Sequence, residues 1–270
     1  MKAIHATAVA ALSTVAALAP VPAAAQATDA WQFDAALYLY LPSVNGTTRF
    51  GNGGSSDATV DVSKVLESLN ATFQGSFEAR RGQWGGYTDF VYVHFSHANS
   101  STRDLSIGGI PLPADVSAAT DFGLKGSAWT VAGLYRAVPD PAMPLDVIAG
   151  ARLLDIKQTL SWQLSGNIGQ FPVQGQVRTQ DASIHSLDAI VGVKGRVALG
   201  GGGKWYLPYY VDVGTGDADL TWQAMGGIGY SFGALSIVGG WRYLDYRFKS
   251  GKPFETLTFS GPVFAAVYRW

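Results

Sequence analysis

Histidine and serine stand two residues apart in the segment His94-Phe-Ser96. On a strand, residues two apart project from the same face, so a histidine base and a serine nucleophile could meet there. Such a pair also needs an acid beside the histidine. Glu78 is too far away for this, because a turn near Gly82 leaves it about 25 Å from His94 at about 3.3 Å per residue. Glu67 would have to reach in from a loop. The spacing therefore favours a polar strand end over a catalytic site.

A second set of acids and a histidine lies near predicted loops. Asp217 and Asp219 stand two residues apart, and His185 follows Asp181 by four. This pattern resembles in part that of omptin-type surface proteases, a resemblance that implies paired aspartates and an Asp–His pair at the rim. No fuller pattern supports this chemistry here, and acids in loops commonly serve solubility. We expect no catalytic residues.

Cofactor and metal sites are not indicated by the sequence. The glycine groups at 200–203 and 226–229 are followed by no helical pattern, which a phosphate-binding loop requires. Asn52 and Asp57 lack the spacing repeat of a calcium loop. Cysteine is absent, which excludes disulfides, thiol catalysis and cysteine–zinc sites. We expect no cofactor and no metal.

Several ionisable residues lie inside segments that alternate between polar and apolar side chains. Their positions fall on the polar face, four acids and four bases in all. If that face lines a barrel, these groups lie in a lumen that side chains can largely fill, and charges there must be paired. The predicted lumen network is Asp34, Glu78, Arg152, Asp188, Lys194, Arg196, Asp212 and Arg242.

Composition limits the class of protein. Of 270 residues only 14% are charged, 12% are aromatic and 33 are glycine, which is unlike a disordered chain. The formal net charge is −1, so no basic surface points to a nucleic-acid partner. These values suit an all-β protein with an apolar outer face.

The first residues have the features of a secretory signal peptide. Lys2 precedes an apolar run over 6–19, and small residues allow cleavage after Ala25 or Ala27. We therefore predict a signal peptide over 1–27 and a single domain over 28–270. A membrane anchor is the alternative. No later stretch of about 20 apolar residues could form a spanning helix, so an exported chain could cross a membrane only as a closed barrel.

Strand patterns continue through the rest of the chain, with short turns alternating with longer connections. The predicted fold is an all-β, antiparallel, up-and-down transmembrane barrel of ten strands, with eight or twelve as alternatives. Loops are expected at 45–56 and around 166–175, and a short amphipathic helix at 61–69 in the first long loop. The ten predicted strands are 31–41, 71–80, 84–96, 120–136, 145–159, 184–199, 205–213, 220–232, 235–248 and 255–270.

Aromatic residues mark the ends of these strands. Trp31, Trp84, Trp205, Phe232 and Trp270 fall at the short-turn ends. We expect Tyr246 and Phe248 to form a second band at the opposite ends, as aromatic residues do at two membrane interfaces. The closing strand carries Phe264, Tyr268 and Trp270 on one face and Arg269 on the other.

That closing strand resembles the last strand of Gram-negative outer-membrane barrels, whose terminal aromatic is read by the barrel assembly machinery. Segments 220–230, 240–246 and 260–264 resemble small barrels of the OmpA/OmpW type, many of which lack an assigned function. The resemblance implies an outer-membrane location, with lipid, lipopolysaccharide and the assembly machinery as partners, and leaves the oligomeric state open.

Three functions follow as hypotheses. The first is a non-enzymatic, porin-like barrel of the cell envelope, either structural or a narrow channel for small solutes. The second is a barrel enzyme: His94 and Ser96 are similar to the His-x-Ser of lipid A deacylases, although Asp104 stands where those enzymes have glutamate, and the strand count resembles omptin proteases. The third is an adhesin that presents the loops at 105–113 and 158–182.

Overall fold

The computed structural model describes residues 30–49, 55–60, 69–99, 106–107, 110–111, 116–168, 171–173, 177–200 and 202–270. No helix in this part of the chain is long and apolar enough to cross a membrane. The predicted signal peptide over 1–27 lies outside it. So does the helix predicted over 61–69, except for Leu69, which begins a strand.

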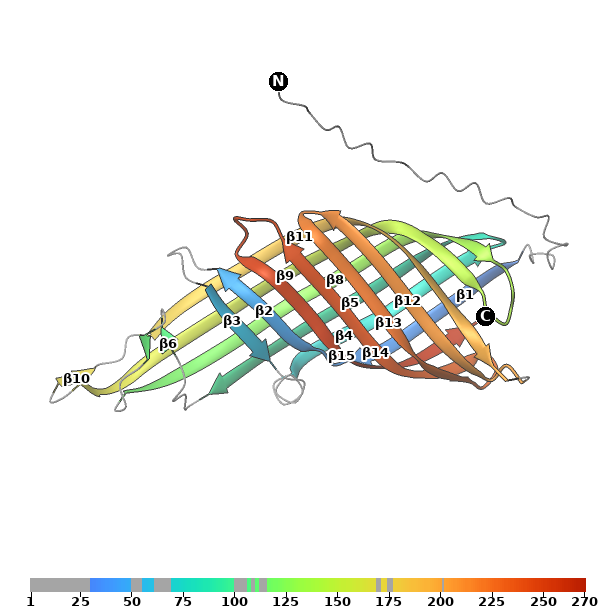
Figure 1. Cartoon of the computed structure of the whole chain (residues 1–270). Coiled ribbons are helices and arrows are strands. Elements are labelled where there is room, and N and C mark those ends of the chain that lie inside the picture. Colours follow the sequence, from blue (N-terminus) through green and yellow to red (C-terminus); the bar gives the residue numbers. More distant parts are fainter. Residues whose placement is uncertain are drawn as a thin grey trace, which may run out of the picture.

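Ten strands form a closed antiparallel barrel, in which β1 pairs with both β4 and β15 (Figure 1). The prediction of a ten-stranded, all-β antiparallel barrel is therefore confirmed. The wall consists of β1 (Trp31–Tyr40), β4 (Leu69–Arg81), β5 (Trp84–Asn99), β8 (Val116–Val138), β9 (Leu145–Ile168), β11 (Val177–Leu199), β12 (Trp205–Gly216), β13 (Ala218–Ser231), β14 (Leu235–Phe248) and β15 (Phe254–Arg269).

Five further strands lie beyond the ten-stranded wall or along its edge. They are β2 (Ser43–Arg49), β3 (Ser55–Val60), β6 (Ser106–Ile107), β7 (Ile110–Pro111) and β10 (Phe171–Val173). The prediction of a loop over 45–56 is wrong for the residues described there. β2 continues the pairing of β1 along the long β15 and forms a hairpin with β3, so its main-chain groups find partners on both sides. β10 likewise folds back on β9.

A side chain joins β1 to β4 where their main-chain pairing ends. The printed pairs run as far as Leu37 and Gly75. Beyond them, the Gln74 side-chain amide accepts a hydrogen bond from the Tyr40 main-chain N–H and donates one, at 3.0 Å, to the Tyr40 carbonyl. Gln74 thereby satisfies two buried main-chain groups that a neighbouring strand would otherwise pair.

The outward face of the wall is apolar on every strand. Because strand residues alternate between faces, each wall strand places its large apolar side chains on the outside. Exposed apolar surface of this extent is far beyond that of a soluble monomer and matches the lipid-facing band of membrane barrels. One exposed example from each strand, in chain order, is Leu37, Phe73, Trp84, Trp129, Leu153, Val191, Val211, Ile228, Trp241 and Phe264.

This apolar band ends abruptly on β9 and β11. Leu153 on β9 and Leu187 on β11 are the last apolar residues of this band. The next outward residues, away from the short turns, are Asp155 and His185, whose side chains lie 2.8 Å apart. Beyond this point β8, β9 and β11 continue as an extension that projects past the other strands, away from the short turns (Figure 1). The chain thus has a short-turn end and an extended end, with the apolar band between them.

Candidate functional site

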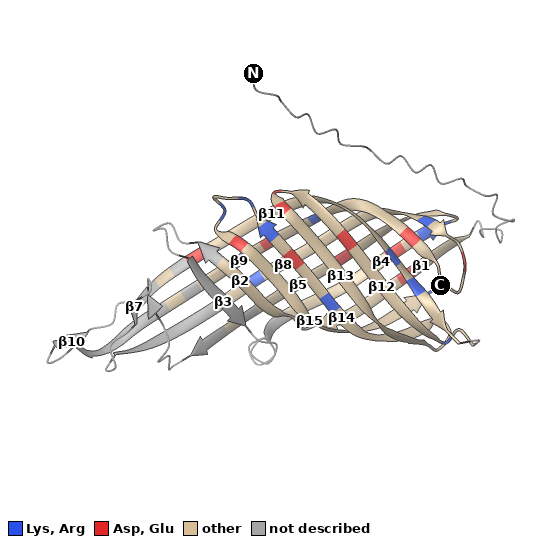
Figure 2. Cartoon of the chain, viewed as in Figure 1, with Lys and Arg blue, Asp and Glu red and all other residues tan. Residues whose placement is uncertain are grey.

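The lumen contains a cavity of about 550 Å³ at the short-turn end. Exposed residues of the turns, including Gln83, Pro139 and Pro141, form its rim, and Tyr210 and Arg242 lie at its buried floor. Charged strand positions lie in this part of the barrel and farther along it (Figure 2). The bases lining the cavity are Arg80, Arg136, Lys194, Arg196, Arg242 and Arg269, and the acids are Asp34, Glu78, Asp89 and Asp146.

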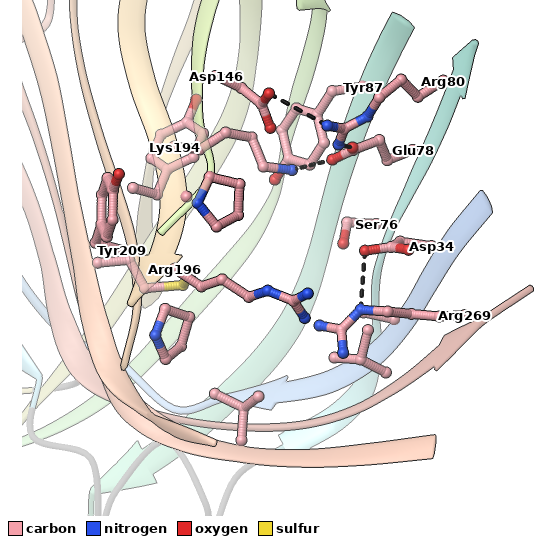
Figure 3. A pocket seen from close by; sticks show the side chains of 18 of the residues that line it. Asp34, Ser76, Glu78, Arg80, Tyr87, Asp146, Lys194, Arg196, Tyr209 and Arg269 are labelled. Atoms are coloured by element: carbon pink, nitrogen blue, oxygen red, sulfur yellow. Dashed lines mark hydrogen bonds and ion pairs between the residues drawn. The ribbon is translucent and has the colours of Figure 1, made fainter. Parts of the chain in front are cut away.

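One wall of the cavity is an ionic cluster from four strands (Figure 3). Glu78 on β4 forms ion pairs with Arg80 and with Lys194, which reaches across from β11. Arg80 Nη1 also lies 3.3 Å from Asp146 Oδ1 on β9, and Asp146 pairs with Arg136 on β8. Each carboxylate therefore has two cationic partners, which offsets the cost of removing it from bulk water.

The cavity floor is closed by Arg242 and its partners. Arg242 Nη2 donates to Asp89 Oδ1 at 2.7 Å and to Gln223 at 2.8 Å, and its Nη1 donates to the Tyr38 hydroxyl at 3.0 Å. Tyr38 in turn donates to the second oxygen of Asp89 at 2.6 Å. These contacts join β1, β5, β13 and β14 across the interior.

Below this floor, toward the extended end, lies a second buried ion pair. Arg152 on β9 pairs with Asp212 on β12, and the side chains of both are 0% exposed. Two further guanidinium N–H groups donate to hydroxyls, Nε to Thr130 at 3.2 Å and Nη1 to Thr221 at 3.4 Å. The ion pair and these two hydrogen bonds offset part of the cost of burying both charges.

The structure brings together two pairs of the predicted lumen network, Glu78 with Lys194 and Arg152 with Asp212. Asp34 instead pairs with Arg269, at 3.1 Å. Two further members have no ionic partner in the described part of the chain. Asp188 accepts hydrogen bonds from the Ser186 hydroxyl at 2.7 Å and the Ala218 N–H at 2.8 Å. The other, Arg196, lies over the ring of Tyr206.

Five charged residues of the cavity were not included in the network predicted from the sequence. Alternation could have found Arg80, two residues after Glu78, and Arg269, which faces away from the apolar side of its strand. The others stand near apolar or turn residues, where the face was harder to assign. The omitted residues are Arg80, Asp89, Arg136, Asp146 and Arg269.

The half of the lumen toward the extended end is apolar. Leu154, Ile156 and Leu244 pack there with Tyr246 and Phe248 in one buried cluster. The prediction that Tyr246 and Phe248 form an outer aromatic band is therefore wrong: they are 0% and 5% exposed. They share the inward face of β14 with Arg242, because each lies an even number of residues from it.

The candidate catalytic residues lie apart from the cavity. Asp89 and Val91 point inward on β5, so alternation puts His94 and Ser96 on the outward face, opposite to Glu78. His185 pairs with Asp155 on the outer surface.

The acids near the loops are engaged elsewhere. Asp181 pairs with Lys157, and Asp217 accepts the Leu187 N–H at 3.0 Å. Among the described residues no cluster of three potential metal ligands is present.

The aromatic residues of the closing strand form part of the outward band. Phe264, Tyr268 and Trp270 are 52–57% exposed. The ring of Trp270 lies 5.3 Å from Phe33 on β1 and 5.5 Å from Tyr268. These rings cover the junction between the first and last strands at the short-turn end.

Comparisons with known proteins agree with this fold. No protein-family model matches the sequence, and no curated protein matches it. Among solved structures, the outer-membrane protease OmpT from Escherichia coli superposes with a TM-score of 0.54 at 9% identity, covering 92% of this chain and 99% of OmpT. The likeness at this identity shows a shared outer-membrane β-barrel fold.

Two other outer-membrane barrels superpose less well. The translocator domain of the autotransporter NalP from Neisseria meningitidis gives a TM-score of 0.37 at 14% identity, covering 89% of this chain and 88% of the domain. Ail, the attachment invasion locus protein of Yersinia pestis, gives 0.33 at 9% identity, covering 89% of this chain and 98% of Ail.

Proposed function

We propose that this protein is a non-enzymatic outer-membrane barrel whose lumen is closed, with a structural role in the envelope. The ion pair between Arg152 and Asp212 carries the proposal, since both side chains are fully buried in the middle of the lumen. A water-filled pore would expose them. The apolar cluster behind this pair blocks the same path a second time.

The apolar band supports placement in the outer membrane, and the connections support an orientation. Membrane barrels of this kind have short turns on the periplasmic side and longer elements outside. The cavity would then open to the periplasm, and the extension of β8, β9 and β11 would stand above the outer leaflet. Lys125, whose exposed side chain stands across the strands from the Lys157–Asp181 pair, would face the phosphates of lipopolysaccharide there.

Planar-bilayer recording of the purified protein tests the closed lumen. We expect no large, steady conductance, because ions would have to cross both the buried ion pairs and the apolar cluster. Insertion is verified separately by the different gel mobility of boiled and unboiled protein. A large, steady conductance of the wild-type protein would contradict the proposal and favour the narrow-channel alternative.

A second candidate function, surface presentation, is favoured by the extension itself. β9 and β11 pair continuously from Gln163 with Val177 to Leu145 with Gly195, well past the end of the apolar band. A rigid sheet above the membrane could hold loops for contact with other surfaces, as an adhesin requires. Cell-adhesion assays with the wild-type protein and a variant shortened over 158–182 test it; equal adhesion would exclude this role.

A further inference from the structure

We propose that the periplasm-facing cavity binds a small organic carboxylate, whose anionic group is held between Arg196 and Arg269 and whose apolar part lies against β14 and β15. This goes beyond a structural role, which requires no ligand. The carrying observation is that two guanidinium groups converge in the cavity and only one of them is neutralised by a protein carboxylate (Figure 3).

Arg196 and Arg269 share one aromatic platform. Their Cζ atoms lie 5.7 Å and 5.4 Å from the centre of the Tyr206 ring. That ring is fixed from behind, because it packs on Gly229 so closely that a Cβ there would come within 2.4 Å of it. Arg269 is further held by Asp34 at 3.1 Å and the Ser236 hydroxyl at 3.0 Å. The platform is therefore built before any ligand arrives.

Arg196 is the group left for a ligand. In the described part of the chain its guanidinium makes no hydrogen bond or ion pair, and its contact is with the ring of Tyr206. The four acids of the cavity are already engaged by the other bases: Asp34, Glu78, Asp89 and Asp146 each have a cationic partner. Six bases against four acids leave an excess of positive charge, which an anion would balance.

The side of the cavity that β14 and β15 form is aliphatic, and it determines which class of anion fits. Val263, Ala265 and Val267 stand in the inward row of β15 that ends at Arg269, and Val238 of β14 lies beside them. A cavity of about 550 Å³ that combines this aliphatic surface with two convergent guanidinium groups suits a small organic anion. A planar carboxylate matches the guanidinium fork, and its apolar body would cover the valines.

Binding is measured by calorimetry on the purified protein in detergent micelles, with benzoate as the probe. Benzamide has the same ring without the charge, and inorganic phosphate has the charge without the ring. We expect benzoate to bind at least about tenfold more tightly than either. Equal affinity for benzamide would overturn the anion site, and equal or tighter binding of phosphate would overturn the organic carboxylate. Both comparisons use the wild-type protein.

Two matched variants locate the site. Arg196→Gln is expected to weaken benzoate binding at least about tenfold, since it removes the charge that has no protein partner. Lys204→Gln removes a cation at the same end of the barrel, on the exposed turn before β12, and should leave the affinity unchanged. Unchanged benzoate binding by Arg196→Gln, or an equal loss in Lys204→Gln, would overturn the assignment.

Discussion

The two halves of the lumen lie inside the same apolar wall but are filled in opposite ways. Toward the short turns the interior is ionic, with Arg152, Arg242 and Glu78 bound to partners from distant strands. Toward the extension it is apolar, with Ile156 and Phe248 in a dry cluster. The outward side chains are apolar along most of both halves.

The difference teaches that the lipid-facing pattern constrains only one side of a barrel wall. Lipid requires apolar side chains outside, whereas the inside accepts any filling in which polar groups are satisfied. An ionic filling depends on partners, and an apolar filling depends on shape. Substitutions should therefore fail for different reasons in the two halves, and by different amounts.

The largest effect is expected for Arg152→Ala. It leaves the fully buried Asp212 without its cation, which should lower the free energy of unfolding by about 3–5 kcal/mol. Urea unfolding of the protein in lipid vesicles, followed by tryptophan fluorescence, measures it. A loss below about 1 kcal/mol would mean that water reaches the pair and that the ionic half is an open channel.

The double substitution Arg152→Met with Asp212→Leu sharpens this comparison. It fills the ionic layer with the kind of side chains that fill the other half, so most of the lost stability should return. If the double variant is as unstable as Arg152→Ala, apolar side chains cannot replace the ion pair at this position. The two halves of the lumen would then differ in shape as well as in polarity.

Ile156→Ala tests the apolar half and should have the next largest effect. The side chain is 2% exposed in the apolar cluster, so its truncation leaves a cavity and should cost about 2–4 kcal/mol. Here no second substitution can restore a partner. The same unfolding assay applies, with the outward Leu153→Ala as the control that shortens a neighbouring side chain without emptying the cluster.

Gln74→Met is expected to cost less, about 1–3 kcal/mol, because it leaves the buried N–H and carbonyl of Tyr40 unpaired. Tyr40 stands at the boundary between the two halves, beside Arg242 on one side and, on the other, a small cavity that Leu154 and Leu244 of the apolar cluster line. Hydrogen exchange of the Tyr40 amide measures the local effect. Exchange as slow as in the wild type would show that another group pairs it.

Arg196→Gln should change the free energy of unfolding least, by no more than about 0.5 kcal/mol. This arginine has no ionic partner, so its replacement leaves no carboxylate unpaired. The measurement is the same unfolding midpoint used for Arg152→Ala. A loss comparable to that of Arg152→Ala would show that Arg196 belongs to the paired network and would remove the basis for a ligand there.

Strand positions were predictable because alternation and turn residues are local signals. The strand expected over 235–248 agrees with β14 as observed, and nine further strands differ mainly at their ends. The hairpin of β2 and β3 was missed because its glycine and serine residues read as a loop. Its strand form depends on β15, more than 200 residues away in the chain, which no local pattern reveals.

For the candidate site, the sequence predicts only which face of its strand each residue occupies. Alternation puts Arg242 and Tyr246 on one side of β14 but says nothing of what stands across the lumen. Arg242 meets Asp89, which is 153 residues away, only because the strands tilt and close into a barrel of a particular size. The same tilt brings Arg196 to Arg269 and carries Tyr246 into the apolar half.

The junction of the first and last strands has a consequence for the order of the chain. Phe33 and Trp270 exchange two main-chain hydrogen bonds, at 2.9 and 3.1 Å, so residue 30 stands only three residues from the partner of Trp270. A short linker could join them while the chain is reopened at the turn before Trp205, giving a circular permutant with every strand pair retained. Such a permutant places Trp270 in the interior of the sequence. It would thereby test the recognition role that the sequence predicts for this residue during insertion separately from its contacts in the finished wall.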